Sequence, residues 1–542
     1  MKKTFEFPNT LTTVICTVAL MLAAAYGLVV AVAGIKPAVL VLAAILGMFA
    51  FALPIEALMR ALLIYSVFLS GVLVYFTPLG PNAYWPAAGL GVVLGVRIPI
   101  ELLSGARERK RSGSSGDGPG RGPIATLSNV VLLVAAAFPV TVLVSSVVGG
   151  APMDQVLLGI KAYFGYWPLM YVLALGMASE KFIAWAWKAL FWCSLIQVPF
   201  VAFQRIVIMP QRLQGASEFD SIVGTFGGDP FGGGSNATLV LYCLVSLYLA
   251  ANYYRVGVHR IAAVALVICT SLACIFAGEV KAVIAFLPMG LTAAFWDTLR
   301  KKPIRFVYML VAAGGFALAI IFAYQAMYWS KNQEVTGASE SDGMTKSLTY
   351  AFNPDQVSVN TGELSRAAVI ALWNQDARGD IPRRWLGYGI FASRASETFS
   401  MGKAAAKYYP LNINWTTAAA LLWDFGLLGM ITFFLIPIST IALILKISAH
   451  PQLSPETRAQ VHVALAIMVI GVPFHFYQNY VYLHPPTQWL YYFAIGYAIH
   501  VARGLPEMPS TRRKSVRASS GFRGIAAAHA DAHLPATAEL SK

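Results

Sequence analysis

The chain has 542 residues, of which 57% are hydrophobic and only 12% are charged. Soluble domains carry about 25% charged residues, so this composition excludes a chain built from ordinary water-soluble domains. The formal net charge is +15. The basic residues gather in short segments between apolar stretches, which indicates membrane loops and argues against a nucleic-acid-binding surface.

Apolar stretches of about 20 residues recur from residue 11 to residue 503, and this length crosses a hydrocarbon core of about 30 Å. The first stretch is longer than the apolar core of a signal peptide, which has about 7–15 residues, so we expect an uncleaved first helix. The pattern predicts an all-α polytopic membrane protein with about 14 transmembrane helices. Their expected positions are residues 11–33, 37–54, 58–77, 85–103, 126–148, 157–177, 182–203, 235–252, 260–277, 282–298, 306–328, 418–446, 461–477 and 487–502.

Three basic clusters orient these predicted spans. They lie between the fourth and fifth spans, between the tenth and eleventh, and after the last. Because Lys and Arg accumulate in cytoplasmic loops, a cytoplasmic amino terminus places all three clusters and the carboxyl terminus on the cytoplasmic side. The clusters are Arg107, Arg109, Lys110 and Arg111; Arg300, Lys301, Lys302 and Arg305; and Arg503, Arg512, Arg513, Lys514 and Arg517.

Two long connections then face outward, and long connections without a spanning role are usually functional. The expected organisation comprises N-terminal transmembrane helices (1–103), a flexible basic cytoplasmic loop (104–125), central transmembrane helices (126–328) with an outward loop (204–234), a large outward loop of short helices (329–417), C-terminal transmembrane helices (418–502) and a basic disordered cytoplasmic tail (503–542).

The sequence lacks the motifs of soluble catalysis and metal binding. Walker-type loops, CxxC pairs, HExxH and GxSxG do not occur, which argues against transport powered by the chain's own ATP site. All five cysteines lie inside apolar segments, so we expect neither a disulfide framework nor a metal site.

Ionisable residues at membrane depth are costly and are functional suspects by default. Lys281, beside Glu279, lies in the short outward turn between the ninth and tenth spans. Its ammonium group suits an anionic headgroup or a phosphate; a turn whose charges reach to the interface is the alternative. Asp424 lies about two turns inside the twelfth span. It is either a helix-start acid near the positive end of the helix dipole or a carboxylate that orients a basic residue of the large loop.

The large outward loop is rich in arginine, and a solvated surface explains most of these charges. Arg366 differs, because residues 363–373 form an amphipathic helical pattern with Arg366 on the same face as apolar residues. A guanidinium group binds pyrophosphate oxygens in a bidentate way that lysine does not copy. Arg366 is therefore the first phosphate-binding candidate in this loop, followed by Arg383 and Arg394.

Two histidines offer further acid–base chemistry. His475 and His484 flank an aromatic segment that includes Tyr477, at the outward end of the thirteenth span. A belt of aromatic residues at the membrane interface is the ordinary explanation. Sugar rings also stack on such side chains, so a glycan-binding mouth is the alternative.

Four motifs follow one another in the middle of the chain. They are Gly224-Thr225-Phe226-Gly227 followed by Asn236; Gly278-Glu279-Val280-Lys281; the arginine helix at 366–373 leading to Gly387-Tyr388-Gly389; and Asp424-x-Gly426-x-x-Gly429. In order and spacing they resemble the O-antigen polymerase and ligase superfamily, the Wzy-like and WaaL-like membrane glycosyltransferases, over roughly residues 200–450. Arg212 and Gly228 match an arginine-to-glycine spacing of the family's polymerases. Ligases of the family carry a histidine where this sequence has Trp415, and this departure favours a polymerase.

The resemblance implies a GT-C-like fold in a bacterial inner membrane and metal-independent glycosyl transfer at the periplasmic face, without a cofactor. The donor would be an oligosaccharide on undecaprenyl pyrophosphate, and membrane lipids, a chain-length regulator and a flippase would be partners.

The resemblance also implies roles for the candidate residues. Arg366 and Lys281 would neutralise the charge of the departing pyrophosphate. Asp424, Glu363 or His475 would be the general base. The remaining substrate-binding candidates are Arg212, Glu279, Arg383, Arg394 and Tyr477.

Two other function classes stay open at this point. A flippase or transporter of lipid-linked sugars has a similar number of spans, but such proteins usually consist of two similar halves, and no duplication is visible here. A non-catalytic subunit of an exopolysaccharide assembly system is the third possibility.

Overall fold

The structure, a computed structural model, describes residues 46–111, 123–211, 221–230, 235–324, 353–355, 357–358, 362–395, 400–478 and 484–506. The expected first span at 11–33, Arg212, residues 325–352 of the large loop and the tail from residue 507 lie outside these ranges. The described residues are helical apart from turns and one antiparallel pair of two-residue strands, which confirms the all-α class.

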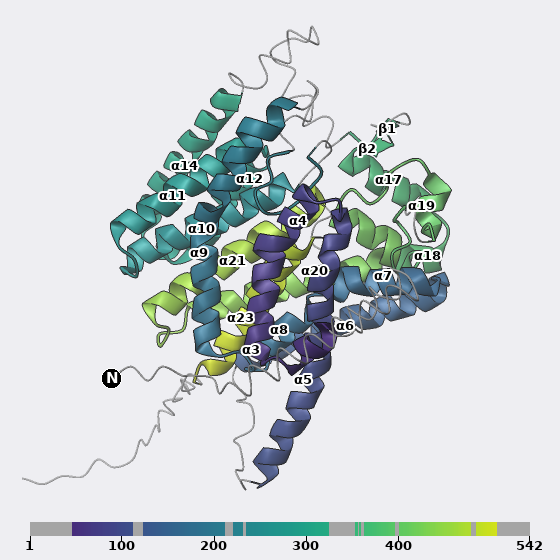
Figure 1. Cartoon of the computed structure of the whole chain (residues 1–542), viewed down its shortest axis with the longest axis horizontal. Coiled ribbons are helices and arrows are strands. Elements are labelled where there is room, and N and C mark those ends of the chain that lie inside the picture. Colours follow the sequence, from purple (N-terminus) through teal and green to yellow (C-terminus); the bar gives the residue numbers. More distant parts are fainter. Residues whose placement is uncertain are drawn as a thin grey trace, which may run out of the picture. The chain divides into compact units, whose positions relative to one another are not determined.

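Figure 1 shows the helices and their order along the chain. They are α3 (Ile55–Leu63), the π-helix η1 (Ile64–Leu69), α4 (Ser70–Phe76), the 3-10 helix η2 (Gly80–Tyr84), α5 (Trp85–Arg111), α6 (Pro123–Gly149), α7 (Met153–Phe164), α8 (Trp167–Ala174), α9 (Glu180–Phe203), η3 (Gln204–Ile208), η4 (Met209–Gln211), α10 (Asn236–Val256), α11 (Ile261–Ala277), α12 (Val283–Ala294), α13 (Trp296–Lys301), α14 (Pro303–Tyr324), α17 (Arg366–Asp376), α18 (Ile381–Leu386), α19 (Lys403–Tyr408), α20 (Thr417–Ser448), α21 (Pro455–Tyr477) and α23 (Pro485–Gly504). Strand β1 (Val357–Ser358) pairs with β2 (Glu363–Leu364).

Eight helices among the described residues are long and apolar enough to cross a membrane, and the bent pair α7–α8 would make nine. The chain is therefore a multi-pass membrane protein, as predicted. Of the 14 expected spans, 11–33 lies outside the described residues and 37–54 lies largely outside them. The twelve others exceed the eight or nine candidate spans found there. α11, with 17 residues, is at the lower limit for a spanning helix, and α12, with 12 residues, is below it.

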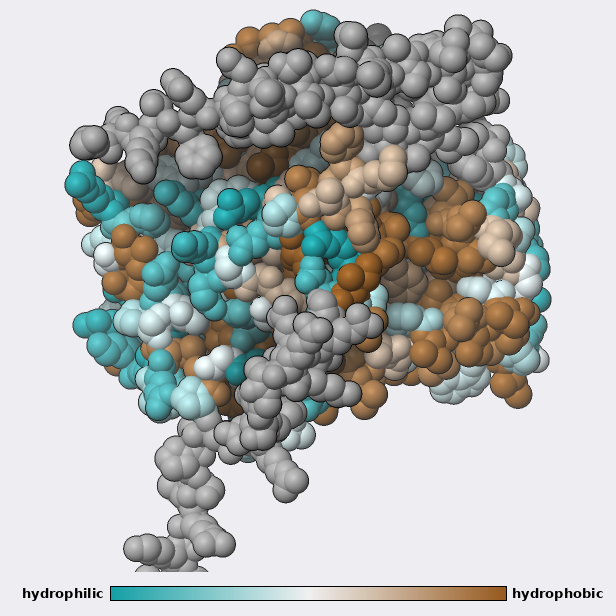
Figure 2. Space-filling view, turned by 60° about the horizontal axis from the view of Figure 1, so that its bottom comes forward, coloured by the Kyte–Doolittle hydropathy of each residue, from teal (hydrophilic) through white to brown (hydrophobic). Residues whose placement is uncertain are grey.

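The outer helices present continuous apolar faces to their surroundings. In Figure 2, hydrophobic side chains form a broad area on the right of the view, beside a hydrophilic area on the left. Exposed apolar residues recur at helical spacing, so each set lies on one face of its helix. They are Leu133, Val140, Val144 and Val147 on α6, and Ile304, Tyr308, Val311, Leu318 and Phe322 on α14. Such faces suit lipid and are too apolar for water.

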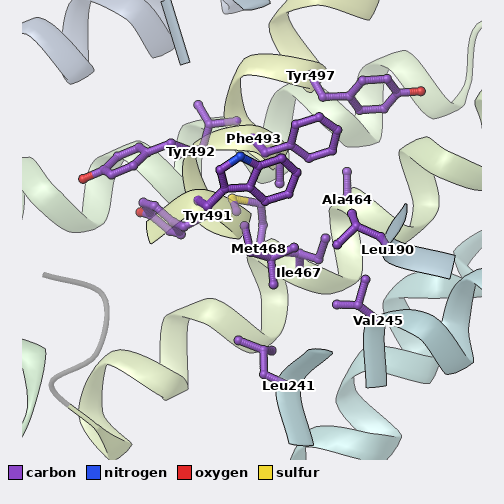
Figure 3. Packing of buried hydrophobic residues seen from close by; sticks show 14 of the residues in the cluster. Leu190, Leu241, Val245, Ala464, Ile467, Met468, Tyr491, Tyr492, Phe493 and Tyr497 are labelled. Carbon is purple, nitrogen blue, oxygen red and sulfur yellow. The ribbon is translucent and has the colours of Figure 1, made fainter. Parts of the chain in front are cut away.

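The interior is built around α10, α21 and α23 (Figure 3). On α23, Trp489, Phe493 and Tyr497 are four residues apart, and their rings stack with centroids 4.7 and 6.1 Å apart. The Tyr497 hydroxyl donates a 2.8 Å hydrogen bond to Gln460 of α21. Because α23 faces protein on most sides, it tolerates these polar aromatic residues. This explains why the helix expected at 487–502 is less apolar than the lipid-facing ones.

The described part of the large loop packs over the first turns of α20, around a second hydrophobic core that includes Trp373 and Trp423. The amphipathic helix expected at 363–373 is α17, which begins at Arg366 and ends at Asp376. It begins there because the Ser365 hydroxyl accepts a 2.9 Å hydrogen bond from the Ala368 N–H, which caps the helix.

Candidate functional site

Residues 221–227 form a buried, non-helical segment inside the helix bundle. Two glutamines satisfy its backbone. Gln204 accepts from two backbone N–H groups at 2.9 and 2.7 Å and donates to the Gly224 carbonyl at 2.9 Å. Gln197 accepts from the Thr225 N–H at 2.7 Å and donates to the Thr225 hydroxyl at 3.0 Å. Because lipid offers no hydrogen bonds, non-helical backbone persists at membrane depth only where protein supplies them.

The loop expected at 204–234 is therefore partly helical and partly buried in the bundle, and does not simply project outward. The spanning helix that begins as α9 continues to Gln211, and the 221–227 segment turns back into the bundle. Gly71 of α4 permits this approach, since a Cβ there would lie 2.1 Å from the Thr225 carbonyl oxygen. His484 Nε2 lies 2.6 Å from the Phe226 carbonyl oxygen. A carbonyl only accepts, so Nε2 carries the proton and His484 anchors the segment.

Asp424 is fully buried, and both of its carboxylate oxygens accept hydrogen bonds. Oδ2 accepts from the Tyr163 hydroxyl at 2.8 Å and from the Phe391 N–H at 3.1 Å, and Oδ1 accepts from the Ser393 N–H at 2.7 Å. Tyr163 belongs to α7, whereas Phe391 and Ser393 follow α18. One carboxylate therefore joins three parts of the fold. The carboxylate thus holds backbone segments in position, and none of its three partners is the basic loop side chain that the orienting hypothesis expected.

Two residues beyond Asp424, helix α20 is broken at Gly426, whose φ and ψ of 63° and −160° are non-helical. The backbone of α18 fits into the break. A Cβ on Gly426 would lie 2.5 Å from the Trp385 carbonyl carbon, and a Cβ on Gly387 would lie 2.6 Å from the α20 backbone. Two α20 carbonyl groups before the break accept from the N–H groups of Tyr388 and Gly389 at 2.9 and 2.8 Å. The glycines of both motifs thus permit close backbone contact.

Two cations lie beside this junction. Lys161 of α7 is half-buried, and its Nζ lies 3.6 Å from the centroid of the Trp85 ring. Arg394 is close enough to Lys161 for the two cations to repel each other, and it lies 5.5 Å from the Phe391 ring. No carboxylate in the described part of the chain forms an ion pair with either cation. Two like charges in a membrane bundle are costly without a counter-ion, so the pair is suited to an anion.

Reasoning from the sequence missed Lys161, although a signal was present. The residue falls inside the span expected at 157–177, and an ionisable residue within a span is a functional suspect by default. Arg394 was proposed, but its proximity to Lys161 follows from tertiary contacts. Gly159, two residues before Lys161, packs so tightly on Ile390 that a Cβ would lie 2.3 Å from its side chain.

Arg366 lies at the same end of the bundle as Lys161 and Arg394, but it contacts a different helix. Its Nε donates a 3.0 Å hydrogen bond to the Tyr477 carbonyl, and its guanidinium lies 4.6 Å from the Tyr477 ring. It therefore binds the C-terminal end of α21, where a cation is favoured by the helix dipole. Phe286 of α12 packs on the same ring at 5.9 Å. This contact places the start of α12, and with it exposed Lys281, near Tyr477.

The turn that carries Lys281 has an unusual backbone. Glu279 adopts a positive φ of 47°, a conformation that few residues other than glycine adopt. The turn is short because α11 ends at Ala277 and α12 begins at Val283. Glu279 is partly buried, while Lys281 is exposed. The structure thus places both candidates in a short turn between two helices of the bundle.

His475 is fully buried among aromatic rings. Its ring lies 5.1 Å from Phe433, 5.4 Å from Phe434 and 5.4 Å from Tyr491. Neither ring nitrogen has a hydrogen-bond partner among the described residues. A general base must reach the proton that it removes, so this position does not favour the proposed catalytic role of His475.

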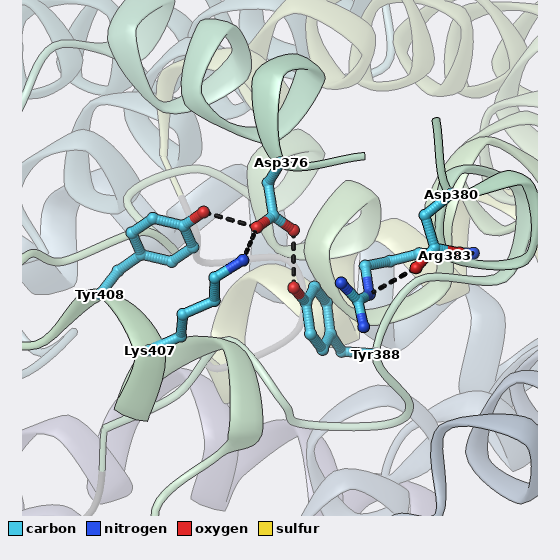
Figure 4. A network of polar contacts seen from close by, with 6 residues as sticks. All are labelled: Asp376, Asp380, Arg383, Tyr388, Lys407 and Tyr408. Carbon is cyan, nitrogen blue, oxygen red and sulfur yellow. Dashed lines mark hydrogen bonds and ion pairs between the residues drawn. The ribbon is translucent and has the colours of Figure 1, made fainter. Parts of the chain in front are cut away.

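A polar network fixes the large loop (Figure 4). The Asp376 carboxylate accepts hydrogen bonds from Tyr388 at 2.6 Å, from Tyr408 at 2.5 Å and from Lys407. Burial alone would raise the pKa of Asp376, but these three hydrogen bonds lower it below its ordinary value. Burial and the bond to Asp376 raise the pKa of Tyr388 to about 12. The network joins α17, α19 and the turn that follows α18.

Arg383, a substrate-binding candidate, has two partners within the large loop. Its Nε lies 3.4 Å from Asp380 Oδ2, and its guanidinium lies 4.5 Å from the Tyr388 ring. Both partners are within the loop, so Arg383 is locally neutralised, in contrast to Arg394.

No protein-family model matches this sequence, and no curated protein matches it. A functional proposal therefore depends on the contacts described above.

Proposed function

We propose that this chain is a membrane glycosyltransferase that polymerises lipid-linked oligosaccharide repeat units at the periplasmic face of a bacterial inner membrane. The donor is a glycan on undecaprenyl pyrophosphate, and the acceptor is a sugar hydroxyl of another lipid-linked unit. The observation that carries the proposal is the half-buried cation pair Lys161–Arg394, which has no carboxylate partner in the described residues and lies where α7 meets α20.

The chemistry of the transfer needs such a pair. The acceptor hydroxyl oxygen forms a bond to the anomeric carbon while the bond from that carbon to the pyrophosphate oxygen breaks. The leaving pyrophosphate takes the electron pair and then the proton that the hydroxyl gives up. Cations held in place at low dielectric stabilise this developing charge without having to reorganise. Arginine and lysine are both suited to phosphate oxygens. Lys161 and Arg394 are our candidates for this role.

Asp424 supports the pair as a positioning residue. Its carboxylate binds Tyr163, two residues after Lys161 on α7, and Ser393, the neighbour of Arg394. Both cations are thus carried by backbone that this one carboxylate holds. Arg366 and Lys281 lie at the same end of the bundle, and in this proposal they contact a second phosphate or a lipid headgroup.

Two features favour polymerisation over the alternatives. Trp415 occupies the position of the ligase histidine in the family that the sequence resembles, which speaks against ligation. A flippase carries lipid-linked sugars across the membrane without breaking a bond, so it has no need to stabilise a leaving group. In a polymerase both substrate and product stay attached to lipid, which suits a cation pair set among membrane helices.

Gene disruption followed by rescue tests the proposal. We expect the disrupted strain to display single repeat units, and the wild-type gene to restore long polysaccharide on a sizing gel. Lys161→Gln and Arg394→Gln should leave single units, whereas the matched control Lys188→Gln, which changes an exposed lysine of α9, should restore long chains. Protein levels of all variants are measured in the same membranes.

Two results would contradict the proposal in different ways. If the disrupted strain keeps lipid-linked units in the cytoplasmic leaflet, the protein is a flippase and the proposed reaction is wrong. If Lys161→Gln and Arg394→Gln restore long chains at normal protein levels, the reaction stands but the site assignment is wrong.

A further inference from the structure

The short helix α18 exposes two apolar side chains on one face. Ile381 is 72% exposed and Trp385 is 47% exposed. They are four residues apart, so they lie one above the other on the helix surface. An exposed isoleucine and tryptophan together form a patch that water does not favour, and patches of this kind mark contact with a partner or a membrane.

The position of α18 along α20 shows which environment it meets. From Thr417 to Gly426 every residue of α20 is buried. Directly after the break, exposed apolar residues recur three or four positions apart, which marks the lipid-facing side of the helix. They are Leu428, Ile431, Leu435 and Ile438. The backbone of Trp385 sits in the break at Gly426, so α18 lies at the border where this lipid-facing stripe begins.

Helix length agrees with that border. α20 has 32 residues, or about 48 Å at 1.5 Å per residue, which is longer than the hydrocarbon core needs. The portion from residue 427 to residue 448 measures about 33 Å on the same basis, close to a core thickness of about 30 Å. The break therefore separates a portion inside the protein from a portion that matches the bilayer.

Contacts with α6 also place α18 at the edge of the lipid-facing surface. The Ser145 hydroxyl of α6 donates a hydrogen bond to the Leu386 carbonyl at the end of α18. Its neighbours Leu143 and Val147 are 65% and 73% exposed and belong to the outer apolar surface of α6. α18 thus lies against two helices at the ends of their lipid-facing stripes.

We propose that α18 lies in the headgroup layer of the bilayer, with Ile381 and Trp385 inserted toward the acyl chains and Arg384 on a lipid phosphate. Tryptophan is enriched at this depth, and basic amphipathic helices lie there in the plane of the membrane. Arg384 is exposed, whereas its neighbour Arg383 is occupied by Asp380 and Tyr388. The surface is continuous with the lipid-facing sides of α6 and α20, so its occupant is lipid.

The inference is independent of the proposed reaction but bears on it. The chain runs from α18 through Gly387 directly to the segment that ends at Arg394, and this segment is bound to Asp424. An α18 seated among headgroups would hold Arg394 near the depth of lipid phosphates.

Site-directed spin labelling in lipid nanodiscs tests this placement. In full-length protein whose native cysteines are replaced by alanine, single cysteines replace Ile381, Trp385 or, as a control, the exposed Gln375 of α17. We expect the ratio of oxygen to nickel-chelate collisions to be severalfold higher at positions 381 and 385 than at position 375, because oxygen partitions into lipid and the chelate into water.

The outcomes separate the possible occupants of this face. Equal chelate access at all three positions would place α18 in water and overturn the proposal. Low access of both reagents at positions 381 and 385 would mean that protein covers α18, and would overturn it too. A further variant, Arg384→Gln, should reduce the ratio of oxygen to nickel-chelate collisions at position 381 in phosphatidylglycerol nanodiscs. An unchanged ratio would contradict the proposed contact between Arg384 and a lipid phosphate. Ile381→Cys alters a largely exposed side chain, so it keeps the test available if Trp385→Cys fails to fold.

Discussion

The Tyr163 hydroxyl donates a 2.8 Å hydrogen bond to the Asp424 carboxylate across 261 residues of sequence. The bond joins α7 to α20. The same carboxylate also binds the backbone of the segment that follows α18, at Phe391 and Ser393. Three stretches that are distant in the chain therefore share one buried group. The properties of this group can be measured separately from any catalytic activity.

Replacing Asp424 by Asn should destabilise the protein. An amide offers one acceptor oxygen where the carboxylate offers two, and its NH₂ group would face a backbone donor. We expect a loss of about 1–3 kcal/mol, since a buried donor left unsatisfied costs about that much. Thermal unfolding in detergent measures it. Tyr163→Phe, which removes one bond, should cost about 1 kcal/mol. Unchanged stability in Asp424→Asn together with lost activity would instead restore Asp424 as a general base.

Gly426→Ala should damage the junction between α18 and α20. A Cβ at this position would lie 2.5 Å from the Trp385 carbonyl carbon, and the φ and ψ values are almost restricted to glycine. We expect a cost of about 2 kcal/mol or more, with α18 displaced. Gly314→Ala on α14 is the matched control, because nothing lies within 4 Å of the added Cβ. If both variants unfold at the same temperature, the break in α20 is not a fixed feature of the fold.

Gln204→Leu should release the buried 221–227 segment. The substitution leaves two backbone N–H groups and one carbonyl without their partners, and each such group costs about 1–3 kcal/mol. Gln204→Glu should have a smaller effect, because burial at membrane depth favours the neutral acid. The neutral acid keeps an acceptor for the two N–H groups and a hydroxyl donor for the carbonyl. Hydrogen exchange at residues 221–227 reports the change directly. Equal protection in both variants and the wild type would show that Gln204 does not hold the segment.

The Asp376 network should make the large loop sensitive to acid. Its folded-state pKa lies below the ordinary value of 3.8, so the folded state binds a proton less readily than the unfolded state. The stabilisation is therefore full above about pH 4 and declines as the pH falls through the folded pKa. Proteolysis of the loop at decreasing pH measures this loss. Asp376→Asn should be labile even at neutral pH, whereas Asp355→Asn, at an exposed site of the same loop, should resemble the wild type.

Sequence patterns predicted the elements whose physical cause is local. The apolar periodicity located α6, α9 and α20 within a few residues, because a helix that faces lipid must be apolar over most of its length. The same rule overcounted at α12, where the helix is too short to span. It located α23 within a few residues, but it did not predict that protein would surround this helix. Hydropathy reports whether a segment avoids water, not whether lipid or protein surrounds it.

The site was only partly visible from the sequence, for a similar reason. Arg394 and Asp424 were named as candidates, but their connection depends on backbone donors at Phe391 and Ser393, and any residue except proline supplies such donors. His475 seemed suited to acid–base chemistry by residue type, yet it lies among apolar rings. Lys161 was detectable by its charge alone. Its partner Trp85 lies 76 positions earlier in the chain, beyond the reach of any spacing rule.

The two glutamines around residues 221–227 also constrain how the protein is made. The segment leaves the ribosome after the helix that carries Gln197 and Gln204, so its partners for hydrogen bonding are already present when it arrives. If the glutamines followed the segment in the chain, its backbone N–H and C=O groups would enter the membrane before these hydrogen-bond partners were synthesised. Lipid cannot replace such partners. The order of these residues along the chain thus allows insertion to proceed in the direction of synthesis.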